Sequence, residues 1–212
     1  MKTVLNYTFF CSITILLLIS CNTKLSHEDA VKYYFSILNL VNKANNETSL
    51  YFIDEMNIMG SSEINDTTLI LNNHKIDSLN KRFKKFISYL DSNIEALNNV
   101  PETDKSINLK LNGIAYLKQN KDFCIQMSKW DLDTVAEHDE NRIEDQTASR
   151  NLIHEVMKND LNNYWDIFLK SSDEYIKKHL ITNEELKKNN LYPSTPFFSA
   201  TSSKGTLRKY EL

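Results

Sequence analysis

Glycine and proline are scarce in this chain, with only three of each in 212 residues. Proteins built from sheets need many tight turns, and those turns draw heavily on these two residues. The scarcity therefore argues against an all-β fold. The few glycines and prolines separate long stretches in which apolar residues recur every three or four positions, and this spacing is typical of amphipathic helices. The composition predicts an all-α protein.

A hydrophobic run long enough for a membrane span is lacking at the N-terminus. An apolar stretch from about Phe9 to Ile19 follows a positive charge at Lys2. It is shorter than the roughly 20 apolar residues of a transmembrane helix, and Ser12 and Thr14 interrupt it. Because the sequence that follows is polar and has no stop-transfer pattern, we expect a cleaved signal segment rather than a membrane span.

The end of this stretch, Leu18-Ile19-Ser20-Cys21, resembles the lipobox of bacterial lipoproteins, in which an aliphatic, a variable and a small residue precede a cysteine. The resemblance implies that the Cys21 thiol receives a diacylglyceryl group, that the chain is cut before Cys21, and that the new amino group is acylated, for example with palmitate. Two or three acyl chains hold a protein stably on a bilayer. The resemblance thus implies a signal peptide over residues 1–20, a tether over 21–26, and lipidation at Cys21.

The residues after Cys21 indicate where the protein is located. Surface-exposed lipoproteins of the Bacteroidota tend to carry acidic residues directly after the cysteine, and Asn22-Thr23-Lys24-Leu25 has none. The resemblance to this group implies an anchor in the outer membrane of the cell envelope, facing the periplasm. A eukaryotic alternative stays open, because Asn46-Glu47-Thr48 and Asn65-Asp66-Thr67 match the glycosylation pattern. The terminal Lys-Tyr-Glu-Leu also partly resembles an endoplasmic-reticulum retention signal.

Cysteine is as scarce as glycine. With Cys11 removed and Cys21 lipidated, Cys124 is the one thiol left, so the mature chain can form no intramolecular disulfide. A reactive cysteine needs a nearby base and electropositive surroundings, whereas Cys124 lies in the helical pattern "KDFCIQM". We expect a buried, structural Cys124.

A strong net charge and recognisable catalytic motifs are also lacking. The formal net charge is −3, so no basic surface points to nucleic acid. The isolated Gly60, Gly113 and Gly205 form no phosphate-binding loop. No histidine stands three residues after a glutamate, as ferritin-like di-iron sites require, and Lys158 takes the place of the second histidine after His154-Glu155. We expect no catalytic activity and no cofactor.

What the chain does contain is four long helical patterns. The first starts at Ser26, where Asp29 approximates a capping box, and it reaches a turn at 60–62, although the polar sequence "NKANNETS" leaves the continuity of its middle open. The second runs from about residue 76 to 99 and stops before Pro101. The third starts around Asp104 or Ser106, and the fourth runs from about 147 to 180. A capping box at Thr182 opens a short last helix.

Four such helices with short connections predict an antiparallel four-helix bundle over residues 27–192, with a short extra C-terminal helix and an extended tail over 193–212. The apolar spacing places the following residues in its core: Val31, Tyr34, Ile37, Leu38, Leu40, Val41, Tyr51, Phe52, Met56, Ile76, Leu79, Phe83, Phe86, Leu90, Ile94, Leu97, Ile107, Leu111, Ile114, Leu117, Cys124, Met127, Ile153, Met157, Leu161, Tyr164, Phe168, Tyr175 and His179.

One segment, "DLDTVAEHDENRIED" at 131–145, carries dense negative charge. Neighbouring carboxylates repel one another, and a divalent cation or a basic partner would relieve that repulsion. Against an EF-hand, Ala136 stands where the glycine is needed, so a solvated acidic connection between the third and fourth helices is the other interpretation. The candidate metal ligands are Asp131, Asp133, Glu137, His138 and Asp139.

Two groups of aromatic residues could serve recognition. Tyr33-Tyr34-Phe35 and Tyr164-Trp165 either pack in the core or line a ligand cleft at a bundle end. In the tail, Phe197 and Phe198 either pack back over the bundle or contact a partner.

The patterns together predict a lipid-anchored, periplasm-facing helical bundle without catalytic activity. We expect it to act as an interaction or scaffold module of the cell envelope, in contact with the membrane through its lipid and with an envelope protein as a possible partner. The alternative is a bundle that binds a ligand or divalent cation through segment 131–145. The sequence assigns no oligomeric state.

Overall fold

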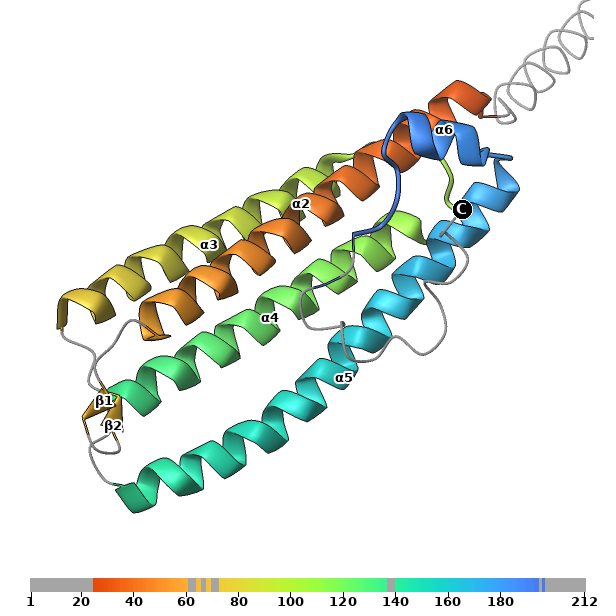
Figure 1. The fold of residues 1–212 in the computed structure, drawn as a ribbon. Coiled ribbons are helices and arrows are strands. Elements are labelled where there is room, and N and C mark those ends of the chain that lie inside the picture. The colour runs from red at the N-terminus through yellow and green to blue at the C-terminus, as the bar shows by residue number, and fades with distance from the viewer. Residues whose placement is uncertain are drawn as a thin grey trace, which may run out of the picture.

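The computed structural model describes residues 25–60, 64–65, 68–69, 73–136, 140–194 and 196. Four long helices, each antiparallel to the next along the chain, form the bundle: α2 (His27–Gly60), α3 (Asn73–Asn99), α4 (Leu109–Ala136) and α5 (Glu140–Lys178) (Figure 1). The short helix α6 (Asn183–Lys188) follows α5. The predicted all-α class, the antiparallel four-helix bundle and its short extra C-terminal helix are confirmed.

A small hairpin that the sequence patterns do not predict lies between α2 and α3 along the chain. Its antiparallel strands, β1 (Ile64–Asn65) and β2 (Thr68–Leu69), are two residues each. So short a pairing leaves no alternation of apolar and polar residues to recognise in a sequence.

The bundle is elongated, and its two ends differ (Figure 1). The start of α2 and the whole of α6 lie at one end, and the hairpin lies at the other. With 34 residues, α2 is about 51 Å long at 1.5 Å per residue. Helix α4 packs against both α3 and α5, while α2 packs against α3 and α4. No helix among the described residues combines the length and apolar character needed to cross a membrane.

Helix α2 is continuous through its polar middle. It starts as the sequence predicts, because the Ser26 Oγ accepts a hydrogen bond from the Asp29 N–H at 3.1 Å. The polar residues Asn45 and Thr48 in its middle are 1% and 2% exposed. They are polar because they form hydrogen bonds inside the bundle, and the helix does not break there.

Two predicted helix starts are wrong. The third helix begins at Leu109 rather than at Asp104 or Ser106, because the Asp104 carboxylate accepts the Ser106 N–H at 2.9 Å and forms a local turn instead. Helix α5 begins at Glu140 rather than near Thr147, since no glycine or proline interrupts the sequence between them.

The core follows the predicted positions with two exceptions. Among the predicted residues whose side chains are described, all are buried or half-buried except Leu111, which is 57% exposed, and Tyr164, which is 36% exposed. Within α4 the predicted Ile114, Leu117 and Cys124 are buried, and so are Leu109, Tyr116 and Phe123, which the spacing did not select. The helices that flank α4 decide which of its apolar residues are covered, and spacing within one helix does not contain that information.

Gly113 marks a close approach between α4 and its neighbours. A Cβ at this position would lie 3.3 Å from a Leu97 methyl group and 3.3 Å from the Phe168 ring. The absence of a side chain therefore lets three helices approach one another closely at this level.

Candidate functional site

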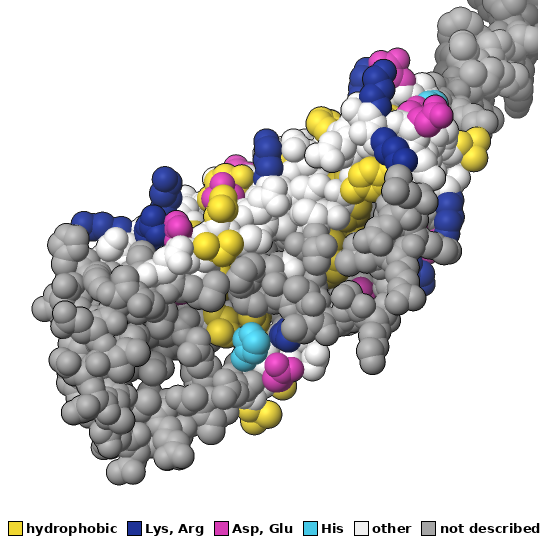
Figure 2. All heavy atoms as spheres, viewed as in Figure 1, with side chains coloured by type: hydrophobic (Ala, Val, Ile, Leu, Met, Phe, Trp, Pro, Cys, Tyr) yellow, Lys and Arg dark blue, Asp and Glu magenta, His cyan; other side chains and the backbone are white. Residues whose placement is uncertain are grey.

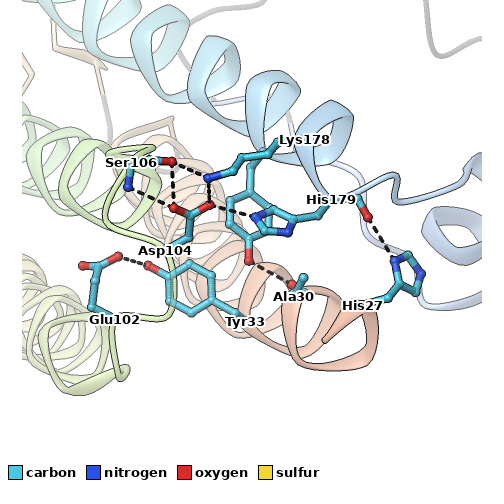
Figure 3. Close-up of polar contacts among 9 residues, drawn as sticks. His27, Ala30, Tyr33, Glu102, Asp104, Ser106, Lys178 and His179 are labelled. Carbon is cyan, nitrogen blue, oxygen red and sulfur yellow. Dashed lines mark hydrogen bonds and ion pairs between the residues drawn. The ribbon is translucent and has the colours of Figure 1, made fainter. Parts of the chain in front are cut away.

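A network of polar side chains joins four parts of the chain at the end of the bundle where α2 begins (Figure 3). Its centre is Asp104, in the connection between α3 and α4. Asp104 Oδ2 accepts a hydrogen bond from Lys178 Nζ at 2.6 Å and lies 2.8 Å from His179 Nε2. Asp104 Oδ1 accepts the Ser106 hydroxyl at 2.8 Å. Lys178 Nζ also contacts the Ser106 Oγ.

The charge on Asp104 is stabilised by these contacts. Its carboxylate is only 9% exposed, and burial by itself raises the pKa of a carboxyl group. The hydrogen bonds from Lys178, Ser106 and His179 outweigh burial, so the pKa of Asp104 lies well below its usual range. Asp104 is an ionised acceptor that holds the connection before α4 against the end of α5.

His27 links the first turn of α2 to the end of α5 and to α6. Its Nδ1 lies 3.0 Å from the His179 carbonyl oxygen, and its Nε2 lies 2.6 Å from Glu185 Oε1. Both partners are acceptors, and only the protonated imidazole has a donor on each nitrogen. The bond to Glu185, and after it the bond to the His179 carbonyl, therefore raises the pKa of His27.

Glu185 is also a member of the capping box that opens α6. Its carboxylate accepts the Thr182 N–H at 2.8 Å, and the Thr182 hydroxyl accepts the Glu185 N–H at 3.2 Å, as the sequence predicts. The bonds to the Thr182 backbone and to His27 lower the pKa of Glu185 to about 2. One carboxylate thus caps α6 and binds α2.

Two tyrosines also donate hydrogen bonds at this end of the bundle. The Tyr33 hydroxyl donates to the Glu102 carboxylate, and burial followed by that carboxylate raises the pKa of Tyr33 far above its usual range. The Tyr175 hydroxyl donates to the Ala30 carbonyl at 3.3 Å, and burial raises its pKa to about 12. Both hydroxyls therefore stay protonated and act as donors.

The order of these groups differs from that of a catalytic triad. A triad places histidine between serine and aspartate, so that the imidazole can take the serine proton. Here Asp104 lies between Ser106 and His179, and both groups bind the carboxylate. The Ser106 hydroxyl is held as a donor, and the arrangement braces the bundle end without activating a nucleophile.

A second polar region lies inside the bundle between α2 and α4. The Tyr116 hydroxyl donates to Asn45 Oδ1 at 2.6 Å, and Asn120 Nδ2 donates to Thr48 Oγ1 at 3.1 Å. Cys124 is buried beside Asn120, and its pKa is raised by burial. The prediction of a buried Cys124 is confirmed, and a thiol that stays protonated is a poor nucleophile.

The segment Leu191–Ser194, here called the strap, lies along α2. Asn42 Nδ2 donates to the Tyr192 carbonyl at 2.8 Å, and Asn42 Oδ1 accepts the Ser194 N–H at 2.8 Å. Asn45 Nδ2 donates to the Ser194 carbonyl at 3.1 Å. The polar middle of α2 thus binds α4 on one side and the strap on another.

A groove of about 410 Å³ lies between α2 and α3. Asp54 and Arg82, which line it, pair with each other at 2.9 Å, and the Glu55 carboxylate accepts the Tyr51 hydroxyl at 3.2 Å. These charged groups already have protein partners. The other lining residues are Glu47, Leu50, Tyr51, Leu79, Lys85, Phe86 and Tyr89.

Most predicted site residues lie where the structure gives no account of their side chains. Asp131 and Asp133 belong to the last turns of α4, at the end of the bundle away from α6, and only their backbone is described. The other predicted candidates lie outside the described residues: Cys21, Glu137, His138, Asp139, Phe197 and Phe198. Their predicted roles in lipidation, metal binding and partner binding stay predictions.

The side chains that are described include no group of three or more histidines, cysteines or carboxylates able to hold a metal ion. The aromatic pairs are divided between core and surface. Tyr33, Tyr34 and Trp165 are buried, while Phe35 is 43% exposed and Tyr164 is 36% exposed. The buried members pack in the core, as the first of the two interpretations predicts.

Sequence patterns assign no function to the residues of the network around Asp104 and His27. Asp104 and Ser106 read as a helix start and His179 as a core position, and the Asp-x-Ser turn is the one local signal of the actual geometry. The contact between His27 and the His179 carbonyl joins positions 152 residues apart, so no local pattern could reveal it.

Comparison of the chain with family models, with curated proteins and with solved structures gives no match.

Proposed function

We propose that this protein is a lipid-anchored helical bundle of the bacterial cell envelope that faces the periplasm and acts without catalysis as an interaction or scaffold module. In this proposal the chain is attached to the membrane through Cys21. The bundle extends from the attachment point and presents its surface to a protein partner.

The observation that carries the proposal is the bracing of α2 at its start. His27 stands six residues after Cys21, and it is bound to the end of α5 and to α6 by contacts of 3.0 and 2.6 Å. Asp104, in the connection between α3 and α4, binds Lys178 and His179 and so attaches this connection to the same end. A force transmitted through a tether at residues 21–26 would reach three other parts of the chain and not α2 alone.

The chemistry of the described side chains supports a role without catalysis. Asp104 separates Ser106 from His179, and burial holds Cys124 in its protonated form. The polar networks tie helices and the strap to one another, as expected of a rigid body that presents a surface.

The anchor is tested by the intact mass of the protein from its native membrane fraction, beside a Cys21→Ala variant. We expect a chain that starts at Cys21 and carries the added mass of a diacylglyceryl group and an acyl chain, and we expect the variant to leave the membrane fraction. An unlipidated chain, or a variant that stays equally membrane-bound, would contradict the anchor.

The scaffold role is tested separately by cross-linking in intact cells followed by affinity purification. We expect an envelope protein to be recovered in a fixed ratio to the bundle. Recovery of the bundle without any stoichiometric protein would count against the scaffold role and leave the anchor untouched.

A further inference from the structure

An exposed leucine stands at the end of the bundle that the contacts of Asp104 and His27 hold together, here called the braced end. Leu180 directly follows the end of α5 and is 77% exposed, the largest exposed fraction among the large apolar residues whose side chains are described. His27 Nδ1 lies 3.0 Å from the carbonyl oxygen of the neighbouring His179. Leu180 therefore lies beside the start of α2, which is the part of the bundle nearest in sequence to Cys21.

The backbone at Leu180 is unusual for a leucine. Its φ is 55°, in the left-handed region that favours glycine. The Ile181 N–H binds the Ile176 carbonyl at 3.0 Å and the Leu180 N–H binds the Lys177 carbonyl at 3.4 Å, which is the hydrogen-bond pattern of a Schellman motif.

The end of α6 uses the same motif with a residue that suits it. Asn190 has a φ of 52° at the equivalent position, and asparagine tolerates this conformation better than most residues. At the end of α5 the chain instead places a branched apolar side chain in a disfavoured conformation and in contact with water. The cap accounts for the backbone conformation at Leu180, but it does not require an apolar side chain that is exposed to water.

Basic side chains stand in the last turns of the two helices that precede and follow Leu180 along the chain. Lys177 and Lys178 form the last turn of α5, Lys187 and Lys188 form the last turn of α6, and all four are exposed. The nearby carboxylates of Glu185 and Asp104 are bound to His27 and to Lys178 and His179. Figure 2 shows basic, acidic and apolar side chains together at the surface of this end.

Exposed carboxylates also belong to this end, and most of them have protein partners. Glu28 pairs with Lys32 at 2.7 Å, and Asp29 accepts the Ser26 hydroxyl at 2.6 Å. Glu184 is exposed in the first turn of α6. Lys178 is paired with Asp104, so the positive charge at this end comes from Lys177 in the last turn of α5 and from Lys187 and Lys188 in the last turn of α6.

We propose that this end, with Leu180, Lys177, Lys187 and Lys188, rests on an anionic membrane surface, with Leu180 inserted between the headgroups. This inference depends on the proposed lipid anchor. Five residues separate Cys21 from His27, so the two are at most about 22 Å apart when the chain between them is fully extended, and a lipidated Cys21 keeps this end close to the bilayer. A membrane offers an apolar boundary for the leucine and negative headgroups for the lysines.

The test uses the mature lipidated protein with Leu180→Cys labelled with the fluorophore NBD and reconstituted into vesicles of phosphatidylethanolamine and phosphatidylglycerol. Cys124 is buried and does not compete for the label. The matched control is Leu152→Cys, because Leu152 is also an exposed leucine on α5, at 70%, and lies about 40 Å away along the helix. We expect a blue shift and a several-fold gain in emission at position 180 and none at position 152.

Charge is tested in the same assay. Adding Lys187→Glu and Lys188→Glu to the labelled protein should reduce the gain in emission several-fold, as should raising the salt or replacing the lipid with phosphatidylcholine. Equal emission on anionic and neutral vesicles would overturn the electrostatic part of the proposal, and with it the assignment of the lysines.

The outcomes separate this inference from the anchor. A lipidated protein that stays on the vesicles while its probe at 180 emits as in water overturns the membrane contact and leaves the anchor standing. A blue-shifted probe on protein without lipid mass supports the contact and contradicts the anchor. A shift that requires added envelope proteins and not lipid means that Leu180 binds a protein, which also overturns the proposal.

Discussion

Among the single residues, Leu180 offers the sharpest test of stability. We expect Leu180→Gly to raise the free energy of unfolding by about 0.5–1 kcal/mol. The left-handed conformation costs a residue with a Cβ about 1–2 kcal/mol, and glycine avoids this cost. Part of the benefit is lost because glycine gives the unfolded chain more conformational entropy. Urea unfolding followed by circular dichroism measures the change. The same variant should weaken the proposed membrane contact.

The matched control is Leu152→Gly, at an equally exposed position inside α5. Glycine in a helix interior should lower the free energy of unfolding by about 1 kcal/mol. If both variants shift the stability in the same direction, the backbone at Leu180 is not what determines its effect.

His27 should make stability depend on pH in a defined window. Its pKa is raised in the folded protein, so its contribution is present below about pH 6.5, the usual pKa of histidine, and is lost as the pH rises through the folded value. The pKa of Glu185 is lowered to about 2 from its usual value of 4.5, so its contribution is present above pH 4.5 and is lost as the pH falls towards 2. The contact should stabilise most between those two usual values.

We therefore expect the wild type to exceed His27→Gln in stability at about pH 5.5, and the gap to narrow at about pH 8.5, above the usual pKa of histidine. Urea unfolding of both proteins at the two pH values measures this difference. A gap that is the same at both values would show that protonation of His27 has no part in the contact.

At the scale of elements, the polar middle of α2 decides how the strap is held. In an Asn45→Ala variant, the buried Tyr116 hydroxyl and the Ser194 carbonyl each lose the partner that Asn45 provides. We expect a loss of about 2–4 kcal/mol, since each group left without a partner costs about 1–3 kcal/mol. Hydrogen exchange should also become faster in the strap.

The control for this prediction is Tyr116→Phe, which removes the bond between the Tyr116 hydroxyl and Asn45 and leaves the bond from Asn45 to the strap in place. It should cost about 1–2 kcal/mol and leave exchange in the strap unchanged. Faster exchange in the strap of the Tyr116→Phe variant would mean that the two bonds of Asn45 do not act separately.

The elements also show where sequence patterns suffice. The N-cap at Ser26 and the capping box at Thr182 are local, since each involves residues three apart, and both helix starts follow from them. The start at Leu109 depends on the Asp104 carboxylate, whose partners Lys178 and His179 lie on α5 and just beyond it. Contacts between distant parts of the chain override the local pattern there.

At the scale of the whole molecule, Asp131 and Asp133 of the acidic segment fall in the last turns of α4, at the end of the bundle opposite to the braced end. Under the proposed function this segment is solvated. We therefore expect the melting temperature to be the same in calcium and in EDTA. A cation at 100 times its dissociation constant would add about 2.7 kcal/mol, which melting would detect.

A rise in melting temperature with calcium that disappears in an Asp131→Asn, Asp133→Asn double variant would favour the alternative, a cation-binding bundle. A rise that persists in that variant would place the cation elsewhere. The same measurement with magnesium separates a site for calcium from general screening of the acidic charge.

The sequence by itself determined the helical class, the number of long helices, the helix caps at Ser26 and Thr182 and the burial of Cys124, because each depends on residues a few positions apart in the chain. Only the tertiary structure decided that Leu111 and Tyr164 are exposed, that Asn45 and Thr48 are buried, and that α2 continues between them. Which face of a helix is covered depends on its neighbours in space. For the same reason, the network around Asp104 and His27 appears only when residues as much as 158 positions apart are brought together.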